Sequence, residues 1–225
     1  MAQLIYGDAA AAGYERGFAR ISSHFLPFLL RAASVSAGHR VLDIATGTGL
    51  AAEAALAVVG ATGHVTATDI SPQMAERASE RLKVAPNATV RVEDGQALGL
   101  PDDSFDAVIC SLGLMFFPEP ARGLGEFRRV LRSGGRAAVS VATVPKRSYN
   151  TRIFPIVARY VPSMAPDAAR LFSLGDERKL AALFEAAGFR DVKIATANHR
   201  FRVASFDEYF ARLGIGRPDI RIAAR

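Results

Sequence analysis

Two acidic residues and a glycine-bearing turn lie close together in the first third of the chain. Asp43 stands in an apolar run that leads into the turn Ala45–Gly49, and Asp69 stands at the end of a second expected strand over 64–70. Glycine has no Cβ, so its backbone can approach a ligand closely. A strand, a glycine turn, a helix over 50–59 and a second strand ending in Asp form the first half of a nucleotide-binding βαβ unit.

Two classes of cofactor use this layout, and Asp43 distinguishes between them. Gly47, Gly49 and Ala52, with Asp69 behind them, match the fingerprint of NAD(P)-dependent oxidoreductases. A carboxylate inside the first strand would repel a pyrophosphate at the turn, whereas it would attract an ammonium group directly or through a bridging water. S-adenosylmethionine carries an ammonium group and no phosphate. The residues therefore favour this methyl donor over a nicotinamide cofactor.

The segments that must position these residues alternate between strand and helix patterns. Further strands are expected over 89–93, 105–111 and 136–143, and further helices over 72–84 and 118–131. Five strands that alternate with helices predict an α/β fold with a doubly wound, mainly parallel, Rossmann-like sheet and helices on both faces.

The remaining segments complete one expected domain over residues 1–225, because a chain of this length with 50% hydrophobic residues fills one core. Its expected parts are a helical lead-in or lid (1–38), a cofactor-binding core (39–143), an inserted helical cap (144–175) and a C-terminal helix-strand-helix (176–225). Pro27 is expected to kink or split the lead-in helix. The C-terminal part is expected to hold a helix over 176–187, a sixth strand over 192–202, a last helix over 205–213 and, at 219–223, a short candidate for a seventh strand.

Composition excludes several classes of protein. No apolar run approaches the roughly 18 residues of a membrane span, and the first residues lack the features of a secretory signal, so a cytoplasmic protein is expected. The lone Cys110 excludes an internal disulfide and a cysteine-rich metal site, and no metal is expected. The net charge is +6, but the basic residues are scattered rather than interleaved with aromatics, which disfavours nucleic acid as a partner.

Five short motifs, in family order and spacing, resemble those of the class I S-adenosylmethionine-dependent methyltransferases. They are Leu42–Gly49, Thr68–Met74, Asp94–Pro101, Phe105–Leu114 and Phe127–Arg136. The first motif and Ser111–Leu114 are most similar to the ubiquinone and menaquinone C-methyltransferases and related small-molecule methyltransferases. Ala45 departs from the Gly of many members, and the uncertain seventh strand is a second departure.

The resemblance implies roles in binding S-adenosylmethionine. Asp69 would accept hydrogen bonds from both ribose hydroxyls, Asp94 one from the adenine amino group, and Asp43 would orient the methionine ammonium. Met74 would pack on the ribose or adenine, or else lie in the core. The expected cofactor-binding residues are Tyr14, Asp43, Ala45, Gly47, Thr48, Gly49, Asp69, Ile70, Met74, Asp94, Gly95, Gln96, Ser111 and Leu112.

The catalytic residues stay unknown at this stage. Alignment of donor and acceptor alone can contribute roughly 7–11 kcal/mol in favourable cases, so methyl transfer needs little further help. The side chains that could act as a base are interpreted as structural or surface residues: His24, His64, Asp103, Cys110, Glu126 and His199.

The acceptor class is narrowed by absent motifs. No Asn/Asp-Pro-Pro-Tyr/Phe follows 105–111, which disfavours methylation of nucleic-acid bases, and a single cysteine disfavours arsenic methylation. The apolar stretch Leu112–Phe117 favours a small apolar or aromatic acceptor, methylated on carbon or oxygen. An NAD(P)-dependent oxidoreductase, a non-catalytic S-adenosylmethionine-binding module and an RNA methyltransferase remain alternatives, and a homodimer is left open.

Overall fold

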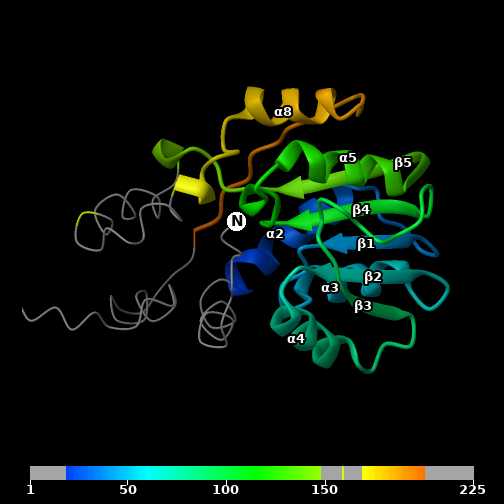
Figure 1. The fold of residues 1–225 in the computed structure, drawn as a ribbon. Helices are drawn as coiled ribbons and strands as arrows, with labels where there is room; N and C mark the ends of the chain where they lie inside the picture. The colour runs from blue at the N-terminus through cyan, green and yellow to red at the C-terminus, as the bar shows by residue number, and fades with distance from the viewer. Residues whose placement is uncertain (1–18, 148–158, 160–168, 201–225) are drawn as a thin grey trace, which may run out of the picture.

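The apolar runs of the sequence form one parallel sheet. The computed structural model describes residues 19–147, 159 and 169–200. Its sheet has the order β3-β2-β1-β4-β5, and all four pairings are parallel (Figure 1). The strands are β1 (Arg40–Ile44), β2 (His64–Asp69), β3 (Ala88–Val92), β4 (Phe105–Ser111) and β5 (Leu131–Ser140). The strand order reverses between β1 and β4, so the crevice outside their carboxyl ends is the place where such sheets bind ligands.

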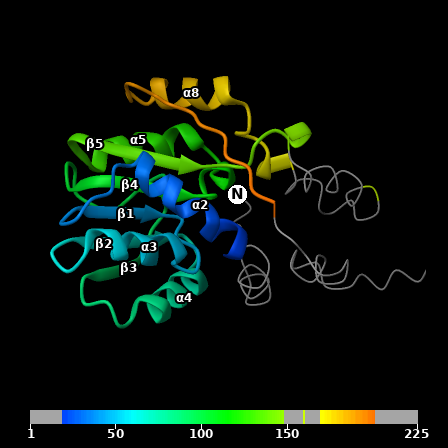
Figure 2. The ribbon, with the colours of Figure 1, turned by 180° about the vertical axis from the view of Figure 1, so that it is seen from behind.

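Helices cover both faces of the sheet, because successive side chains of each strand point to opposite sides. The helices are α2 (Ala19–Ala32), α3 (Leu50–Val59), α4 (Pro72–Leu82), α5 (Pro120–Val130) and α8 (Glu177–Ala186), with short 3-10 helices η1 (Leu114–Phe116) and η2 (Pro145–Arg147). Val41 packs with α2 and α3 on one face, whereas Leu42 packs with α5 and α8 on the other. Figure 2 shows α2 lying across the first of these faces.

The predicted fold class is confirmed. The bounds of α3 and β4 agree with the prediction. Ser71 caps the start of α4, because its hydroxyl accepts a hydrogen bond from the Met74 N–H at 3.4 Å and Pro72 occupies the first turn. α2 continues through Pro27 as one helix, so of the predicted kink or split the split does not occur.

Two further predictions in the second half of the chain are wrong. β5 begins at Leu131 rather than at 136, because Leu131 already pairs with Phe105 of β4; the next pair is Arg136 with Ala107, and 132–135 form an irregularity inside the strand. Residues 192–200 form no strand, because this largely exposed segment bonds to side chains of helices rather than to the edge of β5. Thr196 donates to Glu177 of α8 at 3.1 Å, and the ring of His199 stacks on that of His24 of α2 at 3.6 Å between centroids.

Several other predictions fall outside the described residues. They concern most of the inserted cap, the last helix over 205–213 and the candidate seventh strand at 219–223. In the part of the chain that the structure describes, no helix is long and apolar enough to cross a membrane.

Candidate functional site

The carboxyl ends of β1, β2 and β4 bring most of the expected cofactor-binding residues to one edge of the sheet. Asp43 and Ala45 close β1, Asp69 and Ile70 close β2, and Ser111 and Leu112 close β4. Tyr14 lies outside the described residues.

The carboxyl group of Asp43 is wholly buried at the end of β1. Its Oδ2 accepts a hydrogen bond of 2.6 Å from the hydroxyl of Thr46, while its Oδ1 has no hydrogen-bond partner among the described residues. Burial raises the pKa of Asp43 to about 7, against the lowering effect of the Thr46 bond, and the charge of Asp69 adds to the rise. A buried acceptor with an unused oxygen suits a ligand that brings a cationic donor.

Asp69 joins the end of β2 to the glycine turn. Its Oδ2 accepts a hydrogen bond from the Gly47 N–H at 2.8 Å, and its Oδ1 accepts one from the Ser71 N–H at 2.9 Å. Burial raises the pKa of Asp69, and these backbone bonds partly offset the rise. Each carboxylate oxygen can accept a further bond. Asp69 is therefore an internal brace as well as a candidate ligand, which the sequence did not reveal.

The glycines of the turn allow close packing of the protein as well as close approach of a ligand. Gly47 and Gly49 have φ angles of +57° and +86°, which glycine adopts without strain. A Cβ on Gly49 would lie 3.2 Å from Cα of Ala78 in α4, so this glycine lets α4 approach the turn. Thr48 is buried, and its carbonyl oxygen accepts a hydrogen bond of 2.7 Å from Nε of Arg81, a contact that the sequence did not suggest.

Two residues that are not glycine adopt left-handed backbone conformations where β1 and β4 end. Ala45 has φ +54° and Leu112 has φ +56°. Such a conformation costs about 1–2 kcal/mol for an L-residue, and it is found at functional sites more often than elsewhere. The two turns touch, since a Cβ on Gly113 would lie 2.6 Å from Cβ of Ala45. The N–H of Leu112 is held by the carbonyl oxygen of Ser140 at 3.0 Å.

The loop after β3 presents a third carboxylate, that of Asp94. Oδ1 of Asp94 accepts a hydrogen bond of 2.9 Å from the Gln96 N–H, which closes a turn. Oε1 of Gln96 accepts one of 2.7 Å from the Glu119 N–H, so this side chain fixes the loop to α5. A Cβ on Gly95 would lie 2.5 Å from the ring of Phe117, so Gly95 makes room for that ring.

An apolar surface separates the ends of β2 and β3. Ile70 is 46% exposed and Val92 is 54% exposed, and Val92 pairs in register with Asp69. Exposed apolar side chains next to a carboxylate suit a flat ring that carries polar groups at its edge. Met74 is only 5% exposed and packs in the core instead.

The described residues include few candidates for a base or a metal site. Cys110 is buried, which raises the pKa of its thiol to about 12, and His64 bonds to Thr89 at the opposite edge of the sheet. Glu126 is not the surface residue that the sequence suggested, because its carboxylate accepts a hydrogen bond from the Leu98 N–H at 2.8 Å. In the described ranges, no group of three or more His, Cys, Asp or Glu residues could hold a metal ion.

Comparisons with known proteins point to methyltransferases. A family model described as a methyltransferase domain matches residues 42–139. A demethylmenaquinone methyltransferase of Clavibacter sepedonicus is 36% identical over 72% of this chain and 70% of its own length. A ubiquinone/menaquinone biosynthesis C-methyltransferase of Saccharophagus degradans is 30% identical over 74% of this chain and 73% of its own length. The fold resembles that of a S-adenosylmethionine-dependent methyltransferase from Aquifex aeolicus, with a TM-score of 0.61, 20% identity, and coverage of 82% of this chain and 89% of that one.

The buried Asp43 predicts an unusual dependence of stability on pH. With a pKa of about 7 in the folded state against 3.8 in the unfolded state, the folded protein holds a proton that the unfolded chain has lost. The free energy of unfolding should therefore fall between about pH 4 and pH 7, by up to about 4 kcal/mol. Asp43→Asn should flatten this dependence and be the more stable protein at pH 8. Urea denaturation from pH 4 to pH 8 measures the free energy of unfolding of both proteins. The prediction is contradicted if this free energy changes with pH equally in the wild type and in Asp43→Asn.

The contact between the two left-handed turns predicts coupled mutations. Gly113→Ala should destabilise the protein by about 1–3 kcal/mol, because its Cβ would clash with Cβ of Ala45 at 2.6 Å and with Sγ of Cys110 at 2.9 Å. Ala45→Gly removes the first clash, so the double variant should recover about 0.5 kcal/mol or more of that loss. Thermal unfolding of the four proteins tests this, and additive effects would show that the turns do not touch.

Proposed function

This chain belongs to the methyltransferase domain family and uses S-adenosylmethionine as its methyl donor, and we propose that its acceptor is a small apolar or aromatic molecule, methylated on carbon or oxygen. The observation that carries the assignment of the site is the buried Asp43, whose Oδ1 has no partner among the described residues. A donor with an ammonium group supplies the missing hydrogen bond.

The residues present fit this cofactor. We assign the methionine ammonium to Asp43, the ribose hydroxyls to Asp69 and the adenine amino group to Asp94, with Ile70 against the adenine face. The supporting geometry is the shared edge of the sheet, the free acceptor capacity of each carboxylate, and the 46% exposure of Ile70 next to Asp69. The further residues that we assign to the cofactor surround the same edge: Ala45, Gly47, Thr48, Gly49, Gly95, Gln96, Ser111 and Leu112.

S-adenosylmethionine supplies a methyl group on a positively charged sulfur, which needs no covalent help from the protein. The chain's own residues then act by position. Asp43 holds the amino acid end in a buried site, and the turns at Ala45 and Leu112 fix the backbone beside it. Preorganised geometry of this kind can contribute several kcal/mol to the rate. We assign no catalytic base.

The acceptor is proposed from the relatives and from the apolar residues beyond β4. Two relatives are named for demethylmenaquinone and for ubiquinone or menaquinone biosynthesis, and the second is named a C-methyltransferase. In this chain, Leu114 and Met115 are buried behind the site and Phe116 is half-buried. We therefore favour carbon methylation of a quinone-like or phenolic ring by one cytoplasmic domain, with no nucleic acid as partner.

Two alternatives make different predictions. An NAD(P)-dependent oxidoreductase would place a pyrophosphate beside the buried Asp43, which the negative charge of an ionised carboxylate disfavours. A non-catalytic module would bind the donor and methylate nothing. The first is tested by titration with NAD, and the second by assaying methyl transfer to simple phenols and quinols.

Cofactor affinity should depend on pH through Asp43. S-adenosylhomocysteine should bind more tightly as the pH rises, by up to about tenfold per unit below pH 7, because its ammonium needs the ionised carboxylate. 5′-Methylthioadenosine has no ammonium and should bind with little pH dependence. Calorimetric titration from pH 5.5 to 8.5 measures both, with NAD as a negative control. Asp43→Asn should weaken only the first ligand, and Asp69→Asn should weaken both.

Binding of NAD with no binding of S-adenosylhomocysteine would overturn the proposed function. If the affinities of both adenosine ligands depend equally on pH, the assignment of the cofactor stands, but Asp43 does not bind its ammonium group.

A further inference from the structure

The guanidinium group of Arg129 joins α5 to the loop that follows β3. Its Nη2 donates a hydrogen bond to the carbonyl oxygen of Leu98 at 2.9 Å, and its Nη1 donates to the carbonyl oxygen of Leu100 at 2.7 Å and to Oδ1 of Asp102 at 2.5 Å. One side chain therefore holds three successive points of the loop. Only arginine can make this fork of hydrogen bonds from one side chain, since its planar guanidinium group presents several donors in fixed directions.

Glu126 completes the clamp from the same helix. Its two oxygens accept hydrogen bonds from Nε of Arg129 at 2.9 Å and from Nη2 at 2.7 Å, a bidentate pair that fixes the orientation of the guanidinium. Its Oε2 also accepts the Leu98 N–H at 2.8 Å. Leu98 is thus bound to α5 through both its N–H and its carbonyl group. The bond to Arg129 is the main cause that lowers the pKa of Glu126, so the pair is charged at neutral pH.

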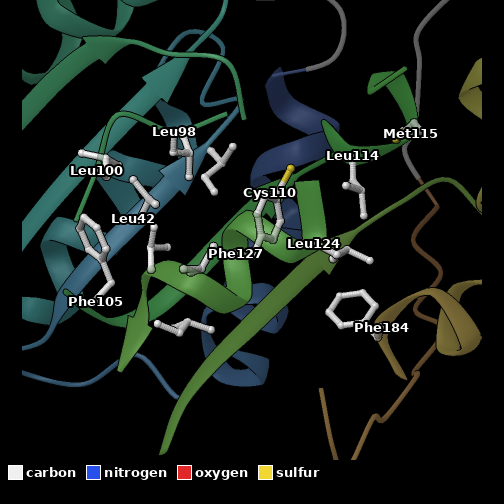
Figure 3. Close-up of a cluster of buried hydrophobic side chains, with 14 of the residues drawn as sticks. Leu42, Leu98, Leu100, Phe105, Cys110, Leu114, Met115, Leu124, Phe127 and Phe184 are labelled. Carbon is white, nitrogen blue, oxygen red and sulfur yellow. The ribbon is translucent and has the colours of Figure 1, made fainter. Parts of the chain in front are cut away.

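The clamped residue directly follows the turn that carries Asp94. This turn is closed by bonds from the Gln96 N–H to Asp94 Oδ1 and from the Ala97 N–H to the Asp94 carbonyl oxygen, each 2.9 Å long. On its other side Gln96 is tied to the start of α5. Figure 3 shows Leu98 and Leu100 lying in the buried cluster with Phe127 of α5, so the loop is anchored by packing as well.

We infer that Arg129 is a positioning residue that sets the place of the Asp94 carboxylate and thereby the selectivity of the site for the amino group of adenine. This inference rests on the proposed function, because it takes Asp94 as the partner of that amino group. Arg129 itself bonds to the loop backbone and to other side chains of the chain, and it acts through them.

The test compares two ligands that differ at the adenine amino group. S-adenosylhomocysteine has this group, and S-inosylhomocysteine has a carbonyl oxygen in its place. The wild-type protein should prefer the first by about tenfold or more, as expected for a hydrogen bond to a charged group. Arg129→Gln should weaken the first ligand by about tenfold and change the second by less than about threefold, so that most of the preference is lost. Calorimetry gives all four dissociation constants.

Matched variants separate positioning from loss of stability. Arg132→Gln removes a neighbouring arginine that pairs with Asp106 at 2.8 Å and makes no described bond to residues 94–101, so it should keep the preference. Val130→Ala removes fully buried atoms from α5, destabilises the protein and should also keep it. Arg129→Lys keeps the charge without the fork, so it should lose most of the preference, and it decides the question if the Gln variant does not fold.

The outcomes are distinct. An unchanged ligand preference in folded Arg129→Gln or Arg129→Lys would overturn the inference, as would an equal loss of affinity for both ligands. A wild-type protein that binds S-adenosylhomocysteine without discriminating between the two bases would overturn it too, but would leave the proposed function standing. A wild-type protein that binds neither ligand would overturn the proposed function itself.

Discussion

Burial of the Asp43 carboxyl group determines how the end of β1 and the turn that follows it are built. A carboxyl group with no exposed surface and one oxygen without a described partner is unfavourable, and the rise of its pKa to about 7 reflects this cost. The fold reduces the cost at two points: the Thr46 hydroxyl bonds to Oδ2, and the N–H of Ala52, in the first turn of α3, faces the carboxyl group. Oδ1 still lacks a described hydrogen-bond partner, and the ammonium group of the proposed cofactor would supply one.

The other parts of the site brace one another around this group. Asp69 holds the Gly47 N–H, so the end of β2 fixes the turn that follows β1. The turn after β4 packs so closely on Ala45 that position 113 has no room for a side chain larger than that of glycine. α5 holds the loop of Asp94 through Glu126 and Arg129. Each of these strand ends is thus held by contacts with a neighbouring element. Such contacts explain how Ala45 and Leu112 keep their left-handed backbone conformations.

Local sequence signals are sufficient where a continuous apolar run ends at turn residues. The bounds of α3 and β4 follow from continuous apolar runs bounded by turn residues, and the start of α4 follows from Ser71-Pro72. The predictions fail where tertiary contacts decide. β5 starts at Leu131, which pairs with Phe105, and 132–135 form an irregularity inside the strand. The segment 192–200 contacts α8 through Thr196 and α2 through His199 instead of forming a strand. The candidate carboxylates can be picked out from the sequence because each follows a strand pattern, whereas the contact of Glu126 and Arg129 with the loop after β3 cannot, because the two residues look like a surface i,i+3 pair.

Titration of the Asp43 side chain by carbon-13 NMR tests the role of its buried carboxyl group. The carboxyl signal can be assigned as the one that Asp43→Asn removes. We expect an apparent pKa of about 7 in the free protein, and a carboxyl group that stays ionised down to well below that pH when S-adenosylhomocysteine is bound, because the ammonium stabilises the charge. A signal that titrates near the ordinary value for aspartate in the free protein, or one that S-adenosylhomocysteine leaves unchanged, would contradict the account.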